Sequence, residues 1–282
     1  MRGLFQPGRL ILLAAAVATA ILIRLAIGWL PELSQRDEYL IDAAAIQVTA
    51  PPRMVPSNFV EQALRRSDLP DQMSLLDETL TRRVHDALLR HPWVAKVVSV
   101  SKQPSGRVVA ELEYRHPVAM VEVERGVYPV DAHGTLLPPA DFTVNDAKQF
   151  PLVIGVTSTP QGPEGTNWGD PVVNGAADLA VQLESSWEDF QLEKIQCRML
   201  QPGMPQTFEL ITRGGSRIVW GCAPSDPRPG EPNAEQKMQR LRKYLKHFGT
   251  FEKPAGPYRI DIRHWQEISR TPLTVGLDKT RR

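Results

Sequence analysis

The sequence predicts an α+β protein: an N-terminal transmembrane helix, a β-α-α-β-β module, and a mostly antiparallel β domain with a C-terminal helix and a closing strand. Three observations predict this class. Residues 10–30 are almost entirely apolar, residues 107–114 alternate between polar and apolar, and Gly214-Gly215 separates two strand-like segments. The hydrophobic share of 42% is enough for ordinary cores.

Changes in composition set the expected divisions of the chain. They are an N-terminus (1–9), a transmembrane helix (10–30), a linker (31–44), the β-α-α-β-β module (45–118), the β domain (119–268) and a C-terminal tail (269–282).

The segment 10–30 is apolar apart from Thr19 and Arg24. A helix of this length, at ~1.5 Å per residue, spans the roughly 30 Å of a hydrocarbon core. Arginines precede the segment and acidic residues follow it, so residues 1–9 are expected in the cytoplasm and the bulk of the chain outside. The alternative is a cleaved signal peptide with a site such as Ala18-Thr19-Ala20. The apolar residues beyond that site favour the uncleaved anchor.

The β-α-α-β-β module begins with a strand at 45–49. Asn58, with Glu61 three residues later, is expected to cap a first helix. Ser74 to Asp77 resembles a capping box that opens a second helix, which ends at His91 because a proline follows. The expected apolar stripe of that second helix is Leu76, Leu80, Val84 and Leu88.

Two strands complete the module, at 93–100 and 107–114, joined by a turn at Lys102–Gly106. One face of these strands is expected to pack on the two helices, which leaves an edge available for a partner strand or covered by a loop.

The β domain is expected to start with a strand at 119–124 that continues the first sheet. A hairpin turns at His133-Gly134, where glycine supplies a positive φ. The remaining expected elements are a loop at 157–171, a helix at 173–185, and strands at 192–200, 207–212, 217–221 and 258–264.

A last helix is predicted after Asn233, which caps it together with Gln236. Gly249 ends this helix. Its apolar stripe is Met238, Leu241, Leu245 and Phe248, and its basic side is Lys237, Arg240, Arg242, Lys243 and Lys246. We do not expect the basic side to bind nucleic acid or lipid, because the formal net charge is only +1 and cations near a helix C-terminus complement the macrodipole.

In their order along the chain, these segments resemble the FtsQ/DivIB family of bacterial cell-division proteins. His91-Pro92-Trp93-Val94 resembles the element that precedes the two strands of the family's POTRA domain, and Pro117-Val118-Ala119 resembles the strand that leaves it. Further similar segments are 128–134, 150–155 and 258–263. The sequence departs from the family at Pro104, which lacks the usual preceding tryptophan, and at His133, where an acidic residue is common.

The resemblance implies a POTRA-like module, a β domain, and a place in the inner membrane as a single-pass scaffold of the divisome. Its implied partners are other membrane cell-division proteins, which it links during septum formation. No cofactor, nucleic acid or small-molecule substrate is implied.

The predicted partner-binding site is the closing strand, offered as an exposed edge to which a partner adds a strand. The alternative is an internal strand, or one covered by the residues after Trp265. The proposed site residues are Tyr258, Arg259, Ile260, Asp261, Ile262 and Arg263.

The sequence contains no motif typical of an enzyme or a metal site. The histidines lack HExxH spacing, and Cys197 and Cys222 are too far apart for a CxxC motif. These two cysteines could form a disulfide or remain separate buried thiols. The acidic residues Glu184, Glu188 and Asp189 fit a solvated helix end better than a glycosidase pair. We therefore predict no catalytic, cofactor-binding or metal-binding residue.

Two other functions were considered. A POTRA protein of an export or assembly system should continue into a barrel of many amphipathic strands, but helices interrupt the remaining residues. A membrane-anchored periplasmic enzyme would need a deep pocket lined by convergent polar groups.

Overall fold

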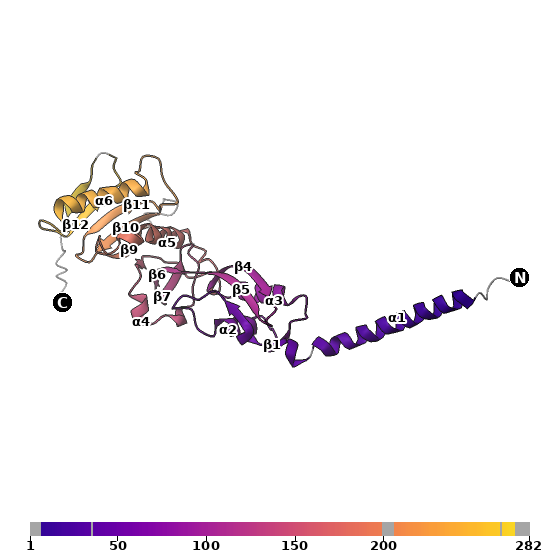
Figure 1. The fold of residues 1–282 in the computed structure, drawn as a ribbon. Coiled ribbons are helices and arrows are strands. Elements are labelled where there is room, and N and C mark those ends of the chain that lie inside the picture. Colours follow the sequence, from indigo (N-terminus) through magenta and orange to yellow (C-terminus); the bar gives the residue numbers. More distant parts are fainter. Residues whose placement is uncertain (1–6, 35, 199–205, 266, 274–282) are drawn as a thin grey trace. The chain divides into compact units, whose positions relative to one another are not determined.

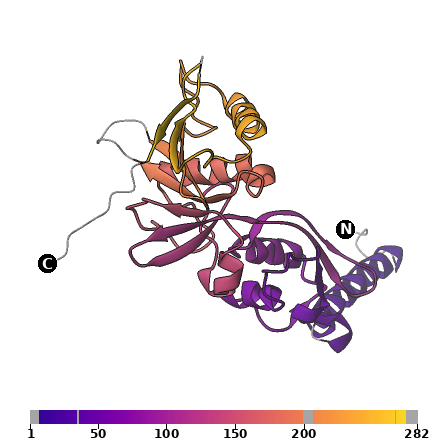
Figure 2. The same ribbon diagram turned by 90° about the vertical axis from the view of Figure 1, so that its left-hand side faces the viewer.

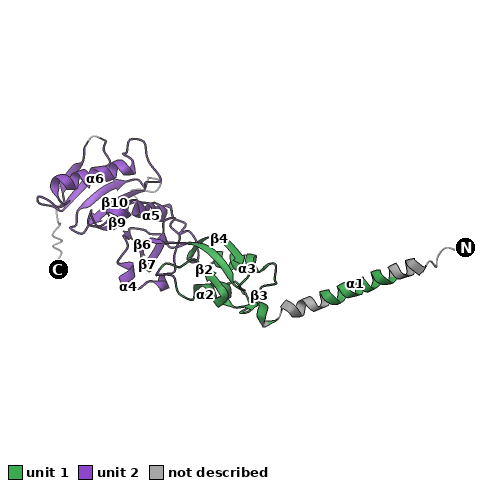
Figure 3. Ribbon diagram, in the orientation of Figure 1, with its two compact units in different colours: residues 1–52, 56–113 green, residues 53–55, 114–282 purple. Residues whose placement is uncertain are grey.

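A computed structural model describes residues 7–34, 36–198, 206–265 and 267–273. The chain splits into two compact units, residues 1–52 with 56–113 and residues 53–55 with 114–282 (Figure 3). The sequence placed the boundary between residues 118 and 119, whereas the units divide between Glu113 and Tyr114.

The N-terminal segment forms helix α1 (Pro7–Ser34), the first helix of the chain (Figure 1). Among the described residues, no helix combines the length and the apolar character that a membrane crossing requires. The predicted transmembrane helix at 10–30 is therefore wrong. The predicted single-pass location in the inner membrane, with a cytoplasmic N-terminus and a periplasmic bulk, depended on that helix and is wrong with it.

The first unit contains the predicted β-α-α-β-β order of elements. Its members are β2 (Ile46–Val48), α2 (Phe59–Arg66), α3 (Leu80–Leu89), β4 (Val94–Lys102) and β5 (Val108–Tyr114). The three strands form a sheet in the order β2-β5-β4, in which β2 runs parallel to β5. The first and last elements of the module are therefore neighbours, and β2 and β4 form the two edges of this sheet.

The start of the second helix differs from the prediction. Ser74 lies in strand β3 (Met73–Ser74), which pairs with β1 (Leu40–Ile41) inside the segment expected to be a linker. Helix α3 starts later because Asp77 accepts hydrogen bonds from the backbone N–H and the hydroxyl of Thr79. Leu76 is consequently 46% exposed, while the other three residues of the expected stripe are buried.

Asn58 also behaves differently from the prediction. Its side chain makes no capping bond to the backbone of α2 and instead accepts a hydrogen bond from Gln62. Glu61 pairs with Arg65 one turn along the same helix. The first turn of α2 is thus held by packing and not by a side-chain cap, because Phe59 lies buried against His91.

The second unit is built on a sheet of eight strands in the order β13-β12-β11-β10-β9-β8-β6-β7. Their bounds are β6 (Pro117–Val123), β7 (Gly126–Asp131), β8 (Leu152–Ile154), β9 (Leu192–Arg198), β10 (Thr207–Thr212), β11 (Arg217–Gly221), β12 (Tyr258–Asp261) and β13 (Ser269–Pro272). The predicted continuation of the first sheet across the boundary is wrong, because β5 and β6 belong to different sheets.

Among the described strands, four of the seven pairs in this sheet are antiparallel, in line with the predicted majority, and three are parallel. Strand β8 runs parallel to both β6 and β9, and β11 runs parallel to β12. Two of these parallel pairs have a physical cause, since α5 (Pro171–Leu183) connects β8 to β9 and α6 (Ala234–Phe248) connects β11 to β12. A crossover helix returns the chain to the same end of the sheet, so the next strand runs in the same direction.

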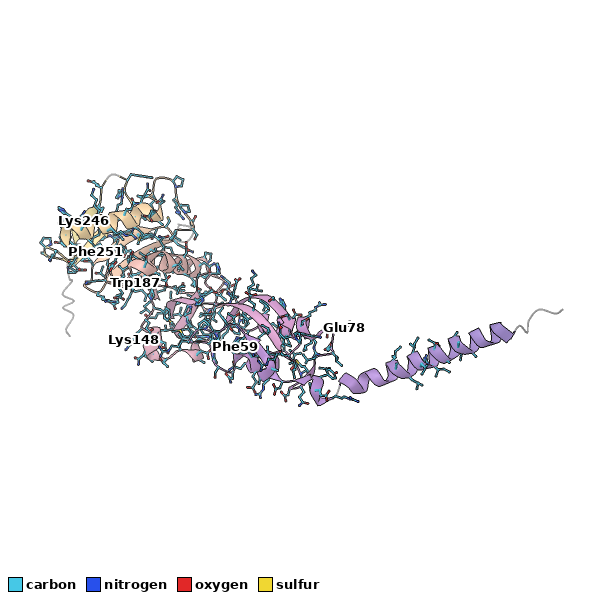
Figure 4. All side chains as sticks on the ribbon, in the orientation of Figure 1. Phe59, Glu78, Lys148, Trp187, Lys246 and Phe251 are labelled. Carbon is cyan, nitrogen blue, oxygen red and sulfur yellow. The ribbon has the colours of Figure 1, made fainter. Side chains whose placement is uncertain are left out.

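Helices α5 and α6 lie on one side of the strands from β9 to β13 (Figure 2). Both helices contribute to the largest hydrophobic core, together with Ile195, Leu210 and Trp220 from the sheet. Phe251 lies beneath α6 and stacks on Tyr244, whereas Lys246 is on the exposed side of that helix (Figure 4). The strands therefore have one face buried by helices and a second face that carries most of their polar side chains.

The predicted ends of α6 are confirmed. Asn233 and Gln236 form a reciprocal capping box, and Gly249 ends the helix with a φ of 80°. The basic side is only partly exposed, because Lys237 is buried against Glu231.

The predicted turn at His133-Gly134 is confirmed as well. Gly134 has a φ of 69°, and Asp131 accepts hydrogen bonds from the backbone N–H groups of His133 and Thr135. Arg115 donates to the other carboxylate oxygen of Asp131 at 2.8 Å. The remaining short elements are α4 (Val144–Ala147) and the 3₁₀ helices Asp37–Tyr39, Ala43–Ala45, Pro139–Asp141 and Glu184–Ser186.

Candidate partner-binding site

The predicted partner strand is strand β12, and it is not an edge. It pairs in parallel with β11 on one side and antiparallel with β13 on the other. The expectation of a free edge at residues 258–263 is therefore wrong, and the alternative of a strand covered by residues after Trp265 is correct. The covering residues, 269–272, had been assigned to a C-terminal tail. Residues 274–282 of that tail lie outside the described residues.

Three of the six predicted site residues belong to the core. Tyr258, Ile260 and Ile262 are buried among residues that α5 and α6 cover. The backbone N–H of Tyr258 donates to the buried hydroxyl of Ser216, and the guanidinium of Arg270 lies 4.6 Å from the centre of the tyrosine ring. These side chains hold the strand in place and are not available to a partner.

The other three residues, Arg259, Asp261 and Arg263, lie on the opposite face, as the alternating pattern predicted. Nη2 of Arg263 is 2.6 Å from Oδ2 of Asp261, and its Nε is 3.0 Å from Oδ1. Burial alone would raise the pKa of Asp261, but the hydrogen bonds from Arg263 outweigh it and lower the pKa below its usual value. Asp261 and Arg263 are therefore charged and engaged with each other.

The outermost strand at this end of the described sheet is β13, not β12. No described residue pairs with the outer side of β13, and the ladder to β12 fixes which backbone groups point outward. The N–H of Leu273 donates to the carbonyl of Pro257, on the β12 side. Since backbone groups alternate between the two sides of a strand, those of Arg270 and Pro272 point away from β12. Arg270 thus presents one N–H and one C=O for a further strand, whereas Pro272 presents only its C=O.

A pocket of about 770 Å³ adjoins this edge and is lined by residues of both β13 and α6. Its lining is Arg240, Lys243, Tyr244, His247, Phe248, Glu267, Ile268 and Arg270. Arg240 donates to the carbonyl groups of Ile262, His264 and Trp265, which anchors the chain between β12 and β13 to the helix. The pocket combines aromatic surface with more basic than acidic side chains.

The geometry suits a peptide better than a reacting substrate. An extended segment could pair with Arg270 through its backbone and place alternate side chains in the pocket. Phe248 and Arg270 contribute the pocket's apolar and cationic sides, with the guanidinium 4.7 Å from the ring centre.

The structure describes residues 7–34, 36–198, 206–265 and 267–273. Within these ranges no cluster of three or more His, Cys, Asp or Glu residues could hold a metal ion. Glu188, from the acidic cluster considered above, forms a surface ion pair with Arg213 at 2.7 Å. Cys197 and Cys222 are free thiols, and burial raises the pKa of Cys197 to about 12, which keeps it protonated.

No pattern in residues 269–272 predicts strand β13. Ser269 to Pro272 is a polar segment without alternating apolar residues, and it contains a proline, which disfavours central strands. Proline is nevertheless compatible with an outermost strand, and this is the one feature that could have indicated an edge.

The sequence was also compared with known proteins. No family model matches the chain, and no curated protein matches it.

Proposed function

We propose that the protein is a docking scaffold of the bacterial cell-division machinery, similar to FtsQ/DivIB proteins, which holds partner proteins through strand addition. The resemblance described above supplies the biological setting. The observation that carries the mechanism is the outer side of β13 beside the α6 pocket, with which no described residue pairs.

Strand addition accounts for the features of this edge. The backbone of Arg270 offers the paired donor and acceptor that a partner strand needs, and backbone bonds give affinity without demanding a particular sequence. The adjoining pocket supplies selectivity through Phe248 and the basic side chains around it. Pro272 removes a donor from the same edge, which limits pairing between copies of the chain.

The first unit supports the same function with a second sheet. Its outer strands β2 and β4 each have one neighbour, β5. A scaffold that binds upstream and downstream partners at once requires two such surfaces. We assign upstream partners to the first unit and downstream partners to the β13 edge.

The decisive experiment compares Arg270→Pro with Arg270→Ala in the full chain. Both variants lose the guanidinium and its contacts with Phe248 and Tyr258, but only the proline variant also loses the outward N–H. Crosslinking in cells followed by identification of the captured proteins should recover division proteins with the alanine variant and lose them with the proline variant. Equal capture by both folded variants would refute strand addition at β13. Capture of proteins unrelated to division would refute the scaffold assignment.

A further inference from the structure

Three arginines surround one buried carboxylate on the face of the large sheet that the helices do not cover. Glu209, in β10, is 1% exposed. Its carboxylate oxygens lie 2.9 Å from Nε of Arg198, 3.0 Å from Nη2 of Arg259 and 4.0 Å from Nη1 of Arg217. We call Arg198, Arg217 and Arg259, which come from β9, β11 and β12, the arginine face.

The charges of this cluster do not balance. One carboxylate faces three guanidinium groups, which leaves a local excess of two positive charges. Asp261, on the same face of the sheet, is already paired with Arg263. Each arginine side chain remains between 36% and 42% exposed, so solvent and ligands can reach it.

The guanidinium groups also retain free hydrogen-bond donors. Nε of Arg198 and Oε2 of Glu209 are close but make no well-aligned hydrogen bond within the described part of the chain. Arg217 makes one side-chain bond there, to the amide oxygen of Gln196 at 3.3 Å. A guanidinium has five N–H donors in a planar fork that matches a carboxylate, and among the described residues most donors of the arginine face have no protein acceptor.

The strand register places like charges side by side. Arg217 and Arg259 occupy paired positions on the parallel strands β11 and β12. Like charges directly opposite each other destabilise a sheet unless a counter-charge lies between or above them. Glu209 supplies one such charge from the neighbouring strand, and a bound anion would supply the second.

We propose that the arginine face binds an acidic, extended segment of a partner protein. Glu209 already occupies the point on which the three guanidinium groups converge, and the remaining excess of two positive charges is matched by two carboxylates of one partner segment. Side chains two residues apart on an extended peptide are separated by roughly 7 Å, so alternate carboxylates can each meet an arginine. This surface is distinct from the β13 edge and does not depend on strand addition.

A nucleic acid fits this surface less well than an acidic peptide. Nucleic-acid sites are extended positive surfaces, whereas here a carboxylate sits among the arginines, the acid–base pair Asp261–Arg263 lies beside them, and the whole chain has a net charge of only +1. The cluster is small and its charge is local, which suits a short acidic segment.

The test uses the full chain and a short fluorescein-labelled peptide of alternating glutamate and threonine, with binding followed by fluorescence anisotropy. We expect Arg217→Gln/Arg259→Gln to weaken binding by about tenfold or more, because two charge-assisted contacts are lost. The matched control Arg213→Gln/Arg242→Gln changes the net charge equally at sites away from the face and should leave binding unchanged. Glu209→Gln removes the competing carboxylate and should tighten binding several-fold.

Folding and ligand class are tested in the same experiment. The triple variant Glu209→Gln/Arg217→Gln/Arg259→Gln leaves no unpaired buried charge, so it should fold and still fail to bind the peptide. A matching lysine–threonine peptide should not bind the native protein.

The proposal is overturned if the control pair weakens binding as much as the face pair, or if Glu209→Gln does not tighten it. It is also overturned if a single-stranded oligonucleotide or inorganic phosphate binds with the same dependence on arginine and the glutamate peptide does not. Arg270→Pro should leave peptide binding intact, which separates this site from the β13 edge.

Discussion

The ammonium group of Lys237 lies 3.1 Å from Oε2 of Glu231, and Lys237 is only 3% exposed. The same oxygen accepts the backbone N–H of Cys222, and the ammonium lies 5.2 Å from the centre of the Trp220 ring. This ion pair joins the loop before α6 to the first turn of the helix. Burial lowers the pKa of Lys237 while Glu231 opposes that effect.

We therefore expect Glu231→Gln to lower the free energy of unfolding by about 3 kcal/mol, because it leaves a buried ammonium without a counter-charge. The double variant Glu231→Gln/Lys237→Met should recover most of the loss, because no buried charge remains. Urea unfolding of the native, single and double variants measures both values. A double variant less stable than the single variant would show that the pair itself stabilises the fold.

The buried ring of His91 predicts a dependence of stability on pH. Burial, and then the positive charge of Arg66, lower its pKa to about 4. The unfolded chain binds a proton near pH 6.5, so it takes up protons before the folded chain does as the pH falls. Stability should be greatest above pH 6.5 and decline by about 2 kcal/mol towards pH 4, less than the full shift implies because solvent screens part of the charge.

His91→Gln provides the control for this titration. Its amide oxygen can replace Nδ1 of His91, which accepts the backbone N–H of Trp93 at 3.4 Å, but it does not titrate. The variant should be less stable at neutral pH and should lose part of the slope between pH 6.5 and pH 4 in urea midpoints. An unchanged slope would assign the pH dependence to other groups.

The two asparagines that precede helices should respond differently to replacement by alanine. Asn233 accepts the N–H of Gln236 in a capping box, so Asn233→Ala should cost about 1 kcal/mol. Asn58 makes no capping bond to the backbone, so Asn58→Ala should cost no more than about 0.5 kcal/mol. Thermal or urea unfolding gives both values, and equal losses would contradict the assignment of the caps.

Gly175, inside α5, allows a close approach between helix and sheet. A Cβ atom there would lie 2.9 Å from Cζ of Phe208 and 3.1 Å from Cβ of Ala223. Alanine normally stabilises a helix by about 1 kcal/mol relative to glycine, but overpacking in a core costs about 1–3 kcal/mol. We expect Gly175→Ala to destabilise the protein on balance.

Val181→Ala on the exposed side of α5 is the comparison for Gly175→Ala, with an expected change within about 0.5 kcal/mol. Urea unfolding distinguishes the two variants. A stabilised Gly175→Ala protein would show that Phe208 can move aside.

Local patterns predicted most of the elements of the fold. Alternation identified β5 and β12, and glycines identified the turns at His133-Gly134 and Gly214-Gly215. Patterns of this kind reflect interactions between residues that are close in the sequence. They therefore predict an element correctly where such local interactions determine its structure. They failed at Ser74, where pairing with the distant Leu40 overrides a capping motif.

The order of strands and the candidate site depend on contacts between distant segments. No sequence period shows that β13 covers β12, or that Glu209 meets Arg259 from a strand fifty residues away. Two of the three parallel pairs, β8–β9 and β11–β12, are predictable from the helices at 173–185 and after Asn233, because a helix between strands favours a crossover.

Strand β8 is three residues long, yet within the described residues it supplies the ladder that joins β6 and β7 to the five strands from β9 to β13. Few backbone hydrogen bonds therefore connect the β6–β7 part of the sheet to the β9–β13 part. A force applied to one outer strand reaches the other through these bonds and through α5, which packs on the sheet. Local opening of this sheet is therefore expected at Leu152–Ile154. The amides of this strand should then exchange with solvent sooner than those of β9 and β10 on its flank.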